Sequence, residues 1–328
     1  MRVAFFEVSK WEEEYLSERL KKHRLTFFTE ALDRKNIEKI KDCEAISVFI
    51  YSKISRDVLD KLSKLKLIAT RSTGFDHIDV EECRKRGINV THVPFYGENT
   101  VAEHTFGLIL ALSRNIHKSY IRTLRDDFSI ENLTGFDLKG KTIGIIGGGN
   151  IGRHVARIAK GFQMNALVYD IQRKRGLAKS TGFQYAELDE LIKNSDIISL
   201  HVPHNKFTHH LINKEKLNLF KKGAILINTS RGEVVDTNAL FSALNKGILG
   251  GVGLDVIEGE ELIKEEKQLL CEEGNEEKWR EIVRNHKIFR MDNVVFTPHN
   301  AFNSREALTR ILDTTIDNIN SENQKFVK

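Results

Sequence analysis

Short apolar runs alternate with helix-like segments along almost the whole chain. A run of four to eight apolar residues is typical of a buried parallel strand, whereas apolar residues spaced three or four positions apart indicate a helix. The alternation predicts an α/β protein, with parallel sheets covered by helices. The runs that predict strands lie at 3–6, 45–50, 67–70, 90–93, 143–146, 166–169, 196–200, 224–228, 251–254 and 294–296.

The pattern also indicates two domains. A chain of 328 residues is too long for one ordinary core. The apolar segment 106–112 predicts a long, mostly buried helix, and we expect the chain to cross between domains just before it. The last helical segment, from about Phe302, needs a surface to pack against, and a return to the first domain would provide one. We therefore predict two Rossmann-like or flavodoxin-like domains, 1–98 with 299–328 and 99–298, with a cleft between them.

A glycine cluster stands where a predicted strand is followed by a helix. Gly147, Gly149 and Gly152 have the spacing of a dinucleotide-binding turn: the first permits the tight turn, the second lets a pyrophosphate approach, and the third allows close packing. Taken alone, such a turn can also serve packing only. Asp170 ends the next apolar run, 18 residues after Gly152, at the expected distance for binding the ribose diol. Together they predict a dinucleotide-binding βαβ unit.

The three prolines mark further candidate positions. Pro94, Pro203 and Pro298 each follow an apolar run directly, and proline cannot continue a central strand. Ligands of open α/β sheets bind beyond the carboxyl ends of the strands, so the neighbours of these prolines are site candidates. These neighbours are Phe95, Tyr96, His201, His204, His299 and Asn300.

Three residues near predicted strand ends could perform acid/base chemistry on a carboxylate substrate. His299 could donate or accept a proton, because imidazole is the side chain suited to acid/base chemistry near neutral pH, although a histidine can equally be a satisfied core or surface residue. Arg231 offers two parallel donors to a carboxylate; a surface ion pair is the alternative. Glu260 could hold the tautomer of His299 and favour its protonated form, or it could be one more carboxylate of an acidic stretch. Spacing does not decide between these readings.

Composition narrows the class of protein. Apolar residues make up 40% and charged residues 30% of the chain, and no apolar run approaches the length of a membrane span, so we expect a cytoplasmic globular protein. The net charge of +5 is mild and its basic clusters have acidic neighbours, which disfavours nucleic acid as a partner. Cys43, Cys83 and Cys271 share no C-x-x-C spacing, so neither a disulfide framework nor a metal site is expected.

Six ordered motifs from about residue 45 onward resemble the D-isomer-specific 2-hydroxyacid dehydrogenase family, closest to its D-lactate dehydrogenase branch. The resemblance implies that Arg231, Glu260 and His299 are catalytic. The departures are GGGNIG, where many relatives have a bulkier middle residue, and FYGEN, where the lactate branch usually has a serine–proline pair; they leave the side-chain preference open. The motifs are RSTGFDHID (71–79), VPFYGENTVAEHTFGLIL (93–110), LKGKTIGIIGGGNIG (138–152), INTSRGEVVD (227–236), GLDVIEGE (253–260) and VVFTPHNAF (294–302).

The resemblance further implies that NADH reduces a small, pyruvate-like 2-keto acid to the D-2-hydroxy acid, with 1–98 and 299–328 as the substrate-binding domain and 99–298 as the NAD-binding domain. Asp170 favours NAD, because a 2′-phosphate would meet its carboxylate, although Arg173 and Lys174 keep some NADP use open. We expect the substrate at Thr73, Gly74, Tyr96 and Phe302. We expect the cofactor at Gly147, Gly149, Asn150, Ile151, Gly152, Asp170, Val202, Thr229, Ser230 and Asp255.

Other members of the family offer alternatives. A phosphoglycerate dehydrogenase often carries an extra regulatory domain, for which the tail after His299 has no room. A non-catalytic NAD-sensing protein would keep the same trio but, we expect, with disordered flanking tails, which the sequence does not show. A formate dehydrogenase needs no histidine–glutamate pair. The family commonly forms a homodimer, and segment 113–135 could be an exchanged arm.

Overall fold

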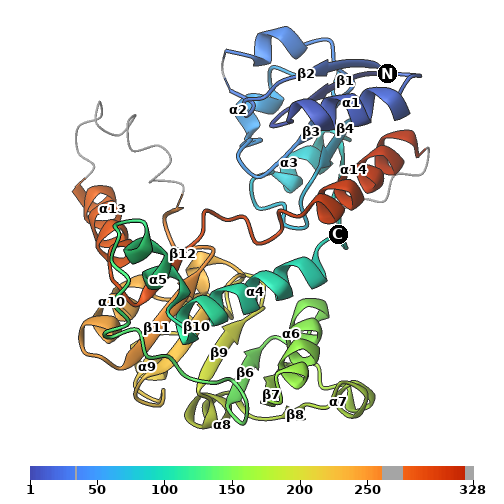
Figure 1. Cartoon of the computed structure of the whole chain (residues 1–328). Helices are drawn as coiled ribbons and strands as arrows, with labels where there is room; N and C mark the ends of the chain where they lie inside the picture. The colour runs from blue at the N-terminus through green and yellow to red at the C-terminus, as the bar shows by residue number, and fades with distance from the viewer. Residues whose placement is uncertain (34, 261–275, 322–328) are drawn as a thin grey trace. The chain divides into compact units, whose positions relative to one another are not determined.

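The computed structural model describes residues 1–33, 35–260 and 276–321 of the chain. It divides the chain into two compact units. The first consists of Met1–Gly97 and the chain from Asn303 onward, and the second is Glu98–Phe302 (Figure 1). The chain therefore returns to the first unit after Phe302. The sequence analysis placed this boundary before His299. The reason is local, because the backbone N–H groups of residues 299–301 all bind Asp255 in the second unit.

The first unit contains a five-stranded, fully parallel sheet in the order β2-β1-β3-β4-β5. Four of its strands fall on predicted apolar runs. The fifth, β2, was not predicted, because it is an edge strand whose residues alternate between exposed and half-buried. The strands are β1 (Arg2–Phe5), β2 (Arg24–Phe27), β3 (Ala45–Val48), β4 (Leu67–Thr70) and β5 (Asn89–Thr91).

The last helix of the chain completes the first unit. Leu312, Ile316 and Ile319 of α14 are buried in one core with Leu16 and with residues of β1, β3 and β4, so the C-terminal helix does pack on the first sheet. The other face carries a second core. The helices of this unit are α1 (Lys10–Arg19), η1 (Ile37–Ile40), α2 (Arg56–Leu59), α3 (Val80–Lys85) and α14 (Arg305–Asn320).

The second unit contains a seven-stranded parallel sheet in the order β12-β11-β10-β9-β6-β7-β8. The chain order reverses between β6 and β9, which is the switch point where α/β sheets bind ligands. Six strands match predicted runs, and β8 was too short to predict. The strands are β6 (Thr142–Ile146), β7 (Asn165–Tyr169), β8 (Gln184–Tyr185), β9 (Ile197–Leu200), β10 (Ala224–Asn228), β11 (Leu249–Leu254) and β12 (Val294–Phe296).

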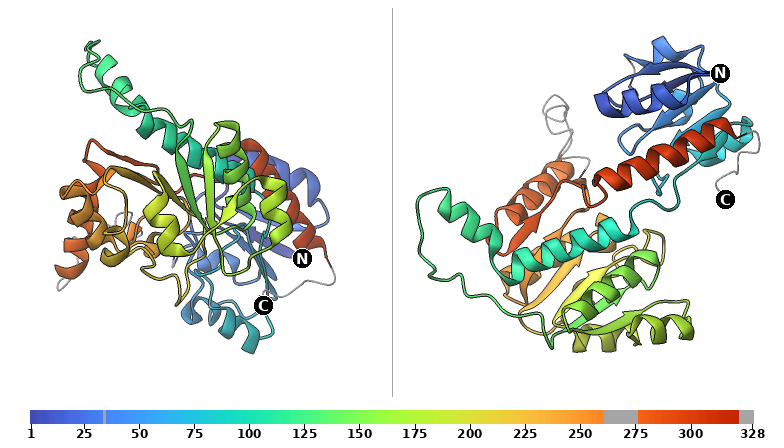
Figure 2. Two further views of the ribbon diagram at one scale, coloured as in Figure 1. Left: turned by 90° about the horizontal axis from the view of Figure 1, so that it is seen from below. Right: turned by 45° about the vertical axis from the view of Figure 1, so that its right-hand side comes forward.

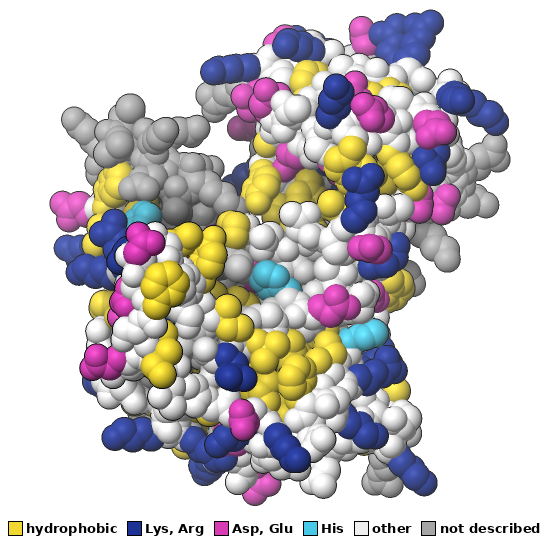
Figure 3. Space-filling view, in the orientation of Figure 1, with side chains coloured by type: hydrophobic (Ala, Val, Ile, Leu, Met, Phe, Trp, Pro, Cys, Tyr) yellow, Lys and Arg dark blue, Asp and Glu magenta, His cyan; other side chains and the backbone are white. Residues whose placement is uncertain are grey.

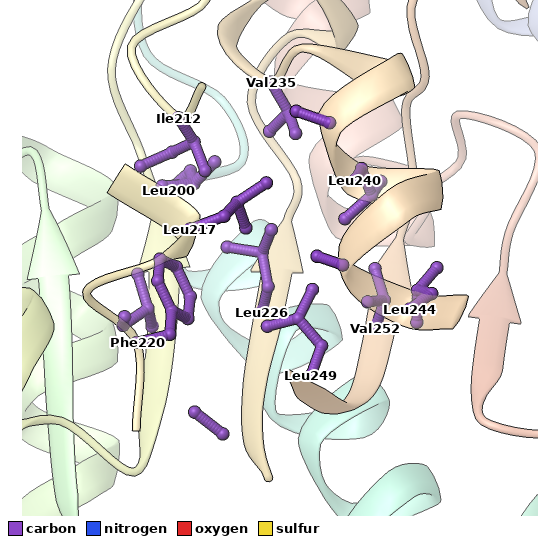
Figure 4. Close-up of a cluster of buried hydrophobic side chains, with 14 of the residues drawn as sticks. Leu200, Ile212, Leu217, Phe220, Leu226, Val235, Leu240, Leu244, Leu249 and Val252 are labelled. Atoms are coloured by element: carbon purple, nitrogen blue, oxygen red, sulfur yellow. The ribbon is translucent and has the colours of Figure 1, made fainter. Parts of the chain in front are cut away.

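Helices cover both faces of this sheet (Figure 2). On one face α4 and α6 pack on alternate strand residues, and on the other α8, α9 and α10 pack on the intervening ones, around Leu200, Leu226 and Val252 (Figure 4). The helices are α4 (Glu98–Ser113), α5 (Ile116–Thr123), α6 (Asn150–Gly161), α7 (Arg175–Thr181), α8 (Leu188–Asn194), α9 (Lys214–Leu217), η2 (Gly232–Val234), α10 (Thr237–Asn245) and α13 (Glu276–Phe289).

The surface charges are mixed in sign, and the two described cysteines are buried. Basic and acidic side chains are interspersed on the face shown in Figure 3. Cys43 and Cys83 are buried thiols, and burial raises the pKa of Cys83 to about 11. Cys271 lies outside the described residues. Within the described ranges no helix has the length and apolarity to cross a membrane.

Candidate active site

The glycine turn lies between β6 and α6, at the switch point of the second sheet. Gly147 has a φ of 106°, which favours glycine, and a side chain there would collide with the carbonyl of His201. A side chain at Gly152 would collide with the Gly147 carbonyl. Gly149 differs from both, because a methyl group there would meet no atom within 4 Å. Only the middle glycine therefore opens onto free space, which suits a diphosphate at the helix start.

Asp170 ends β7 beside this turn. Its Oδ2 accepts a hydrogen bond from the Gly148 N–H at 2.7 Å, and its Oδ1 accepts one from Gln172 N at 2.7 Å. The carboxylate is thus fixed where an adenosine ribose is expected. The nearby Arg173 forms an ion pair with Glu187 at 2.6 Å, which competes with any 2′-phosphate. These contacts favour NAD over NADP.

The remaining residues of the turn and of the β9 end lie close to it. Asn150 binds Glu98 through its Nδ2, at 3.3 Å, and Ile151 is half-buried against the α4–α6 core. Val202 follows β9 and approaches Gly147. His201 donates its N–H to the Ile146 carbonyl, and burial lowers the pKa of its imidazole to about 3. His201 is therefore neutral at physiological pH.

The loop after β10 presents Arg231. The side chain of Asn228 organises this loop: its Oδ1 accepts from the N–H and hydroxyl of Ser230, and its Nδ2 donates to the Arg231 carbonyl at 2.9 Å. The guanidinium of Arg231 donates only to the carbonyl of Ser230, at 2.8 Å, and forms no ion pair with any residue of the described ranges. It is half-buried and keeps most of its donors for another group.

A buried carboxylate organises the loop after β12. Asp255 is 1% exposed; its Oδ1 accepts from Thr297 Oγ1 at 2.5 Å and from Asn300 N at 2.9 Å, and its Oδ2 accepts from Ala301 N at 2.8 Å. The backbone carbonyl of Asp255 accepts from His299 N at 2.9 Å. These bonds hold His299 at a φ of 55°, a left-handed conformation that costs energy for a residue with a side chain.

His299 and Glu260 form a short pair. The distance from His299 Nδ1 to Glu260 Oε1 is 2.6 Å, and both side chains are 21% exposed. A carboxylate accepts only, so Nδ1 carries the proton that it donates to Glu260. Nε2 is then the nitrogen left to exchange a proton with a substrate. The structure brings together two members of the predicted trio, 39 positions apart in sequence.

Thr73, Gly74 and Tyr96 belong to the first unit. The hydroxyl of Thr73 donates to the Val93 carbonyl at 2.8 Å, and the Gly74 carbonyl accepts from Ser72 Oγ at 2.6 Å. Within the described chain, the backbone N–H groups of Thr73 and Gly74 donate no hydrogen bond. The loop therefore offers two donors to an anion. Tyr96 is half-buried, and its carbonyl accepts from Arg310.

The other candidates have diverse environments. Phe302 is half-buried at the end of the second unit, Phe95 is largely exposed, and His204 is exposed and contacts His209. The sequence reading gave no role to His104 and Thr105, which contact the loops of His299 and Arg231. The available signal was their position directly before the apolar run 106–112 of α4.

Comparison with known proteins identifies the family. A profile of the D-isomer specific 2-hydroxyacid dehydrogenase family, NAD binding domain, matches residues 106–301. A 2-hydroxyacid dehydrogenase homolog of Haemophilus influenzae is 39% identical, over 97% of this chain and 95% of that protein. The D-lactate dehydrogenase of Escherichia coli is 36% identical, over 98% and 96%.

The fold agrees. The crystal structure of D-lactate dehydrogenase from Aquifex aeolicus, complexed with NAD and lactic acid, superposes with a TM-score of 0.85 at 40% identity, covering 97% of this chain and 94% of that one. Family profile, sequence identity over nearly the whole length and fold all agree, so this chain belongs to the D-isomer-specific 2-hydroxyacid dehydrogenases, which are NAD-dependent oxidoreductases.

Proposed function

We propose that the protein reduces a small, pyruvate-like 2-keto acid to the D-2-hydroxy acid, with His299 as the general acid and base. The observation that carries the proposal is the 2.6 Å contact between His299 and Glu260, which leaves Nε2 for the substrate. Imidazole is the side chain best suited to proton transfer near neutral pH. The D-lactate dehydrogenases among the relatives support a pyruvate-like substrate.

Arg231 is proposed to bind the substrate. A 2-keto acid presents a carboxylate oxygen and a keto oxygen on the same side, which matches the planar fork of a guanidinium. Arg231 can make this contact without first breaking an ion pair, since it forms none within the described chain. Its positive charge would also polarise the keto group and stabilise negative charge that develops on oxygen.

His299 is proposed to complete the reduction. In its protonated form it would donate the Nε2 proton to the keto oxygen, while Nδ1 stays bound to Glu260. The carboxylate of Glu260 compensates the charge of the imidazolium before transfer and fixes the ring afterwards. In the reverse direction the same nitrogen would accept the proton of the hydroxyl.

The second unit fits NAD. Free space at Gly149, the fixed carboxylate of Asp170 and the N-terminus of α6 match the diphosphate and the ribose of the cofactor. Bound NADH supplies the hydride that reduces the keto carbon. The contacts of the cofactor with Thr229, Ser230 and Val202 remain predictions. For Asp255 we propose an indirect contribution, because its carboxylate already binds the loop of His299.

In the first unit, we propose that the free N–H groups of Thr73 and Gly74 bind the substrate carboxylate. The aromatic rings of Tyr96 and Phe302 are proposed to contact the substrate side chain, so that side-chain size sets the preference among keto acids.

We also propose that the protein is a cytoplasmic homodimer. Helix α5 and the segment after it project from the body of the second unit (Figure 2). They expose large apolar side chains: Leu124 is 67%, Phe128 77% and Ile130 85% exposed. A second copy would bury this surface. Light scattering should show a dimer for the wild type and a monomer for a Phe128→Asp, Ile130→Asp double variant; a monomeric wild type would refute this part of the proposal.

The reaction is tested by following NADH and NADPH oxidation with a panel of keto acids. The panel contains glyoxylate, pyruvate, 2-oxobutyrate, 2-oxoisocaproate, phenylpyruvate, hydroxypyruvate and phosphohydroxypyruvate, and the product is analysed for the D isomer. His299→Ala should lower kcat by about 10²–10⁴-fold and leave NADH affinity unchanged. NADH binding without turnover of any keto acid would refute the proposal and favour an NAD-sensing role.

A further inference from the structure

Helix α4 contacts the loop that carries His299. His104 Nε2 lies 2.9 Å from Thr297 Oγ1, and Thr297 Oγ1 in turn donates to the carboxylate of Asp255. Because the Thr297 proton is used in that bond, His104 must be the donor to Thr297. Asp255 holds the backbone of His299, Asn300 and Ala301, so His104 anchors the whole turn from the helix side.

The next residue of the same helix contacts the loop that carries Arg231. Thr105 Oγ1 donates to the Val101 carbonyl at 2.9 Å and lies 3.1 Å from Thr229 Oγ1. Thr229 is therefore the donor in the second contact. Both hydroxyls are buried, where a hydrogen bond is costly to lose. Thr229 lies two residues before Arg231, so Thr105 fixes the start of that loop.

Two successive residues of one helix thus reach two different loops. Side chains at adjacent helical positions point about 100° apart, so His104 and Thr105 can contact the ends of β12 and β10 at the same time. Helix α4 packs on both strands and on β11. It forms a rigid support for the two loops that bear the proposed proton donor and the proposed carboxylate-binding cation.

We propose that His104 and Thr105 are positioning residues with separate kinetic roles: His104 sets the geometry of proton transfer through the His299 loop, and Thr105 sets substrate binding through the Arg231 loop. The inference rests on the function proposed above for His299 and Arg231. Small displacements of catalytic groups are costly, since a shift of about 1 Å can lower the rate about a hundredfold. Neither His104 nor Thr105 needs to touch the substrate.

The state of His104 is consistent with this role. Burial lowers its pKa, although the Asp255 carboxylate lies 3.6 Å away. A neutral imidazole with its proton on Nε2 makes the bond to Thr297, and it brings no second charge toward Asp255. A glutamine can place an amide donor near the position of Nε2, whereas a phenylalanine fills similar volume without a donor.

The first comparison is between His104→Phe and His104→Gln. We expect His104→Phe to lower kcat about tenfold with little change in the KM for the keto acid, and His104→Gln to retain near wild-type kcat. The kinetic isotope effect with deuterated NADH should change in His104→Phe, because the chemical step becomes slower. A purely structural contribution would instead lower stability in His104→Phe and leave kcat per folded molecule unchanged.

The second comparison is between Thr105→Val and Thr105→Ser. We expect Thr105→Val to raise the KM for the keto acid about tenfold with a smaller change in kcat, and Thr105→Ser to restore it. Ser113→Ala is the matched control. Ser113 lies on the same helix, is fully buried, and its hydroxyl has no hydrogen-bond partner within the described chain, so its removal should change neither parameter.

A spectroscopic measurement keeps this inference separate from the proposed function. With isotope-labelled histidine, the ring signal of His299, assigned by its loss in His299→Ala, should shift in His104→Phe and stay unchanged in Ser113→Ala. No shift, or the same kinetics in His104→Phe, Thr105→Val and Ser113→Ala, would overturn the inference. A wild type without turnover would refute the proposed function, and the His299 signal would still decide whether His104 positions that ring.

Discussion

Within the described chain only two charged side chains are fully buried, one in each unit, and they have opposite sign. Arg71 follows β4 and Asp255 follows β11, each directly after the strand next to a sheet edge. Arg71 donates to the carbonyls of Phe6 and Glu7 at 2.6 and 2.9 Å and to the hydroxyl of Ser47 at 3.1 Å. Asp255 accepts from backbone N–H groups and one hydroxyl.

The difference decides what each loop can offer to a ligand. Arg71 is satisfied by oxygens of Phe6, Glu7 and Ser47, which lie outside its own loop. Within the described chain the backbone N–H groups of Thr73 and Gly74 in that loop donate no hydrogen bond, so they can bind an anion. A buried carboxylate is satisfied by N–H groups, so the loop after β12 has its donors engaged and presents the side chain of His299 instead. The first arrangement suits binding of a carboxylate, and the second suits proton transfer.

The largest effect is expected from Asp255→Asn. The amide has the shape of the carboxylate, but its NH₂ group must face at least one of the donors from Thr297, Asn300 or Ala301. Each buried donor left unsatisfied costs about 1–3 kcal/mol, and a displaced His299 should lower kcat about a hundredfold. Steady-state kinetics and urea unfolding measure the two effects.

Asp189→Asn is the control for Asp255→Asn, because Asp189 is an exposed carboxylate of the same unit with an ion pair to Lys216. It should change neither kcat nor stability by much. If Asp255→Asn left kcat at the wild-type value, the Asp255 carboxylate would not be what holds the His299 turn. The buried carboxylate would then not explain how the loop after β12 presents His299.

The next largest effect is expected from Arg71→Met. The variant keeps the apolar stem and removes the donors, so the carbonyls of Phe6 and Glu7 lose their partner inside the protein. We expect a loss of about 1–3 kcal/mol in the free energy of unfolding, and a KM for the keto acid raised about tenfold, as the loop of Thr73 and Gly74 loosens. NADH affinity, measured by fluorescence, should not change.

Arg2→Met provides the matched control for Arg71→Met, since Arg2 is an exposed arginine of the same unit that pairs with Asp42. An unchanged KM in Arg71→Met, together with a loss of stability, would show that the buried cation supports the fold of the first unit without shaping its anion-binding loop.

The sequence predicted the features that depend on local pattern. Apolar runs gave most strands of both sheets, and the spacing of Gly147, Gly149 and Gly152 gave the turn at the switch point. Edge strands β2 and β8 were missed, because a strand with one exposed side or only two residues leaves no continuous apolar run. The pairing of His299 with Glu260 was one of two alternatives that their chemistry allowed, and the family resemblance favoured it, since no spacing rule connects residues on two different loops.

The supporting contacts could not be predicted in the same way. Nothing in the pattern shows that Asp255 binds three backbone N–H groups, because those bonds depend on the path of the chain after Thr297. His104 and Thr105 lie in the middle of helix α4, where a polar side chain can also bond within its own helix. Long-range contacts of this kind are decided by how α4 packs on β10 and β12.

The half-buried His201 adds a third case to the two buried charges, because its pKa is strongly lowered. Burial lowers the pKa of His201 to about 3 from its ordinary value of 6.5, so between these values the unfolded chain binds a proton that the folded protein does not. Stability should therefore rise with pH across this window and level off above it. At pH 5 the expected loss is about 2 kcal/mol relative to pH 8.

Urea unfolding of the free protein at both pH values measures this loss. In His201→Gln, which has no titrating group at that position, the difference in stability between pH 8 and pH 5 should be smaller by about 2 kcal/mol. His204→Gln removes an exposed histidine from the same segment and should behave like the wild type. Equal pH dependence in all three proteins would show that His201 accepts a proton in the folded state.

The smallest effect is expected at Gly149 of the glycine turn, where we propose that the diphosphate of NADH approaches the backbone. Gly149→Ala adds a methyl group in free space, so folding should be unaffected, while NADH affinity should fall about tenfold because the methyl group occupies the path of the diphosphate. Gly152→Ala, in contrast, should lower the stability of the second unit, because its methyl group collides with the Gly147 carbonyl. Thermal unfolding and NADH titration of both variants separate the two effects. Equal NADH affinity in Gly149→Ala and the wild type would mean that the diphosphate does not approach the backbone at the middle glycine.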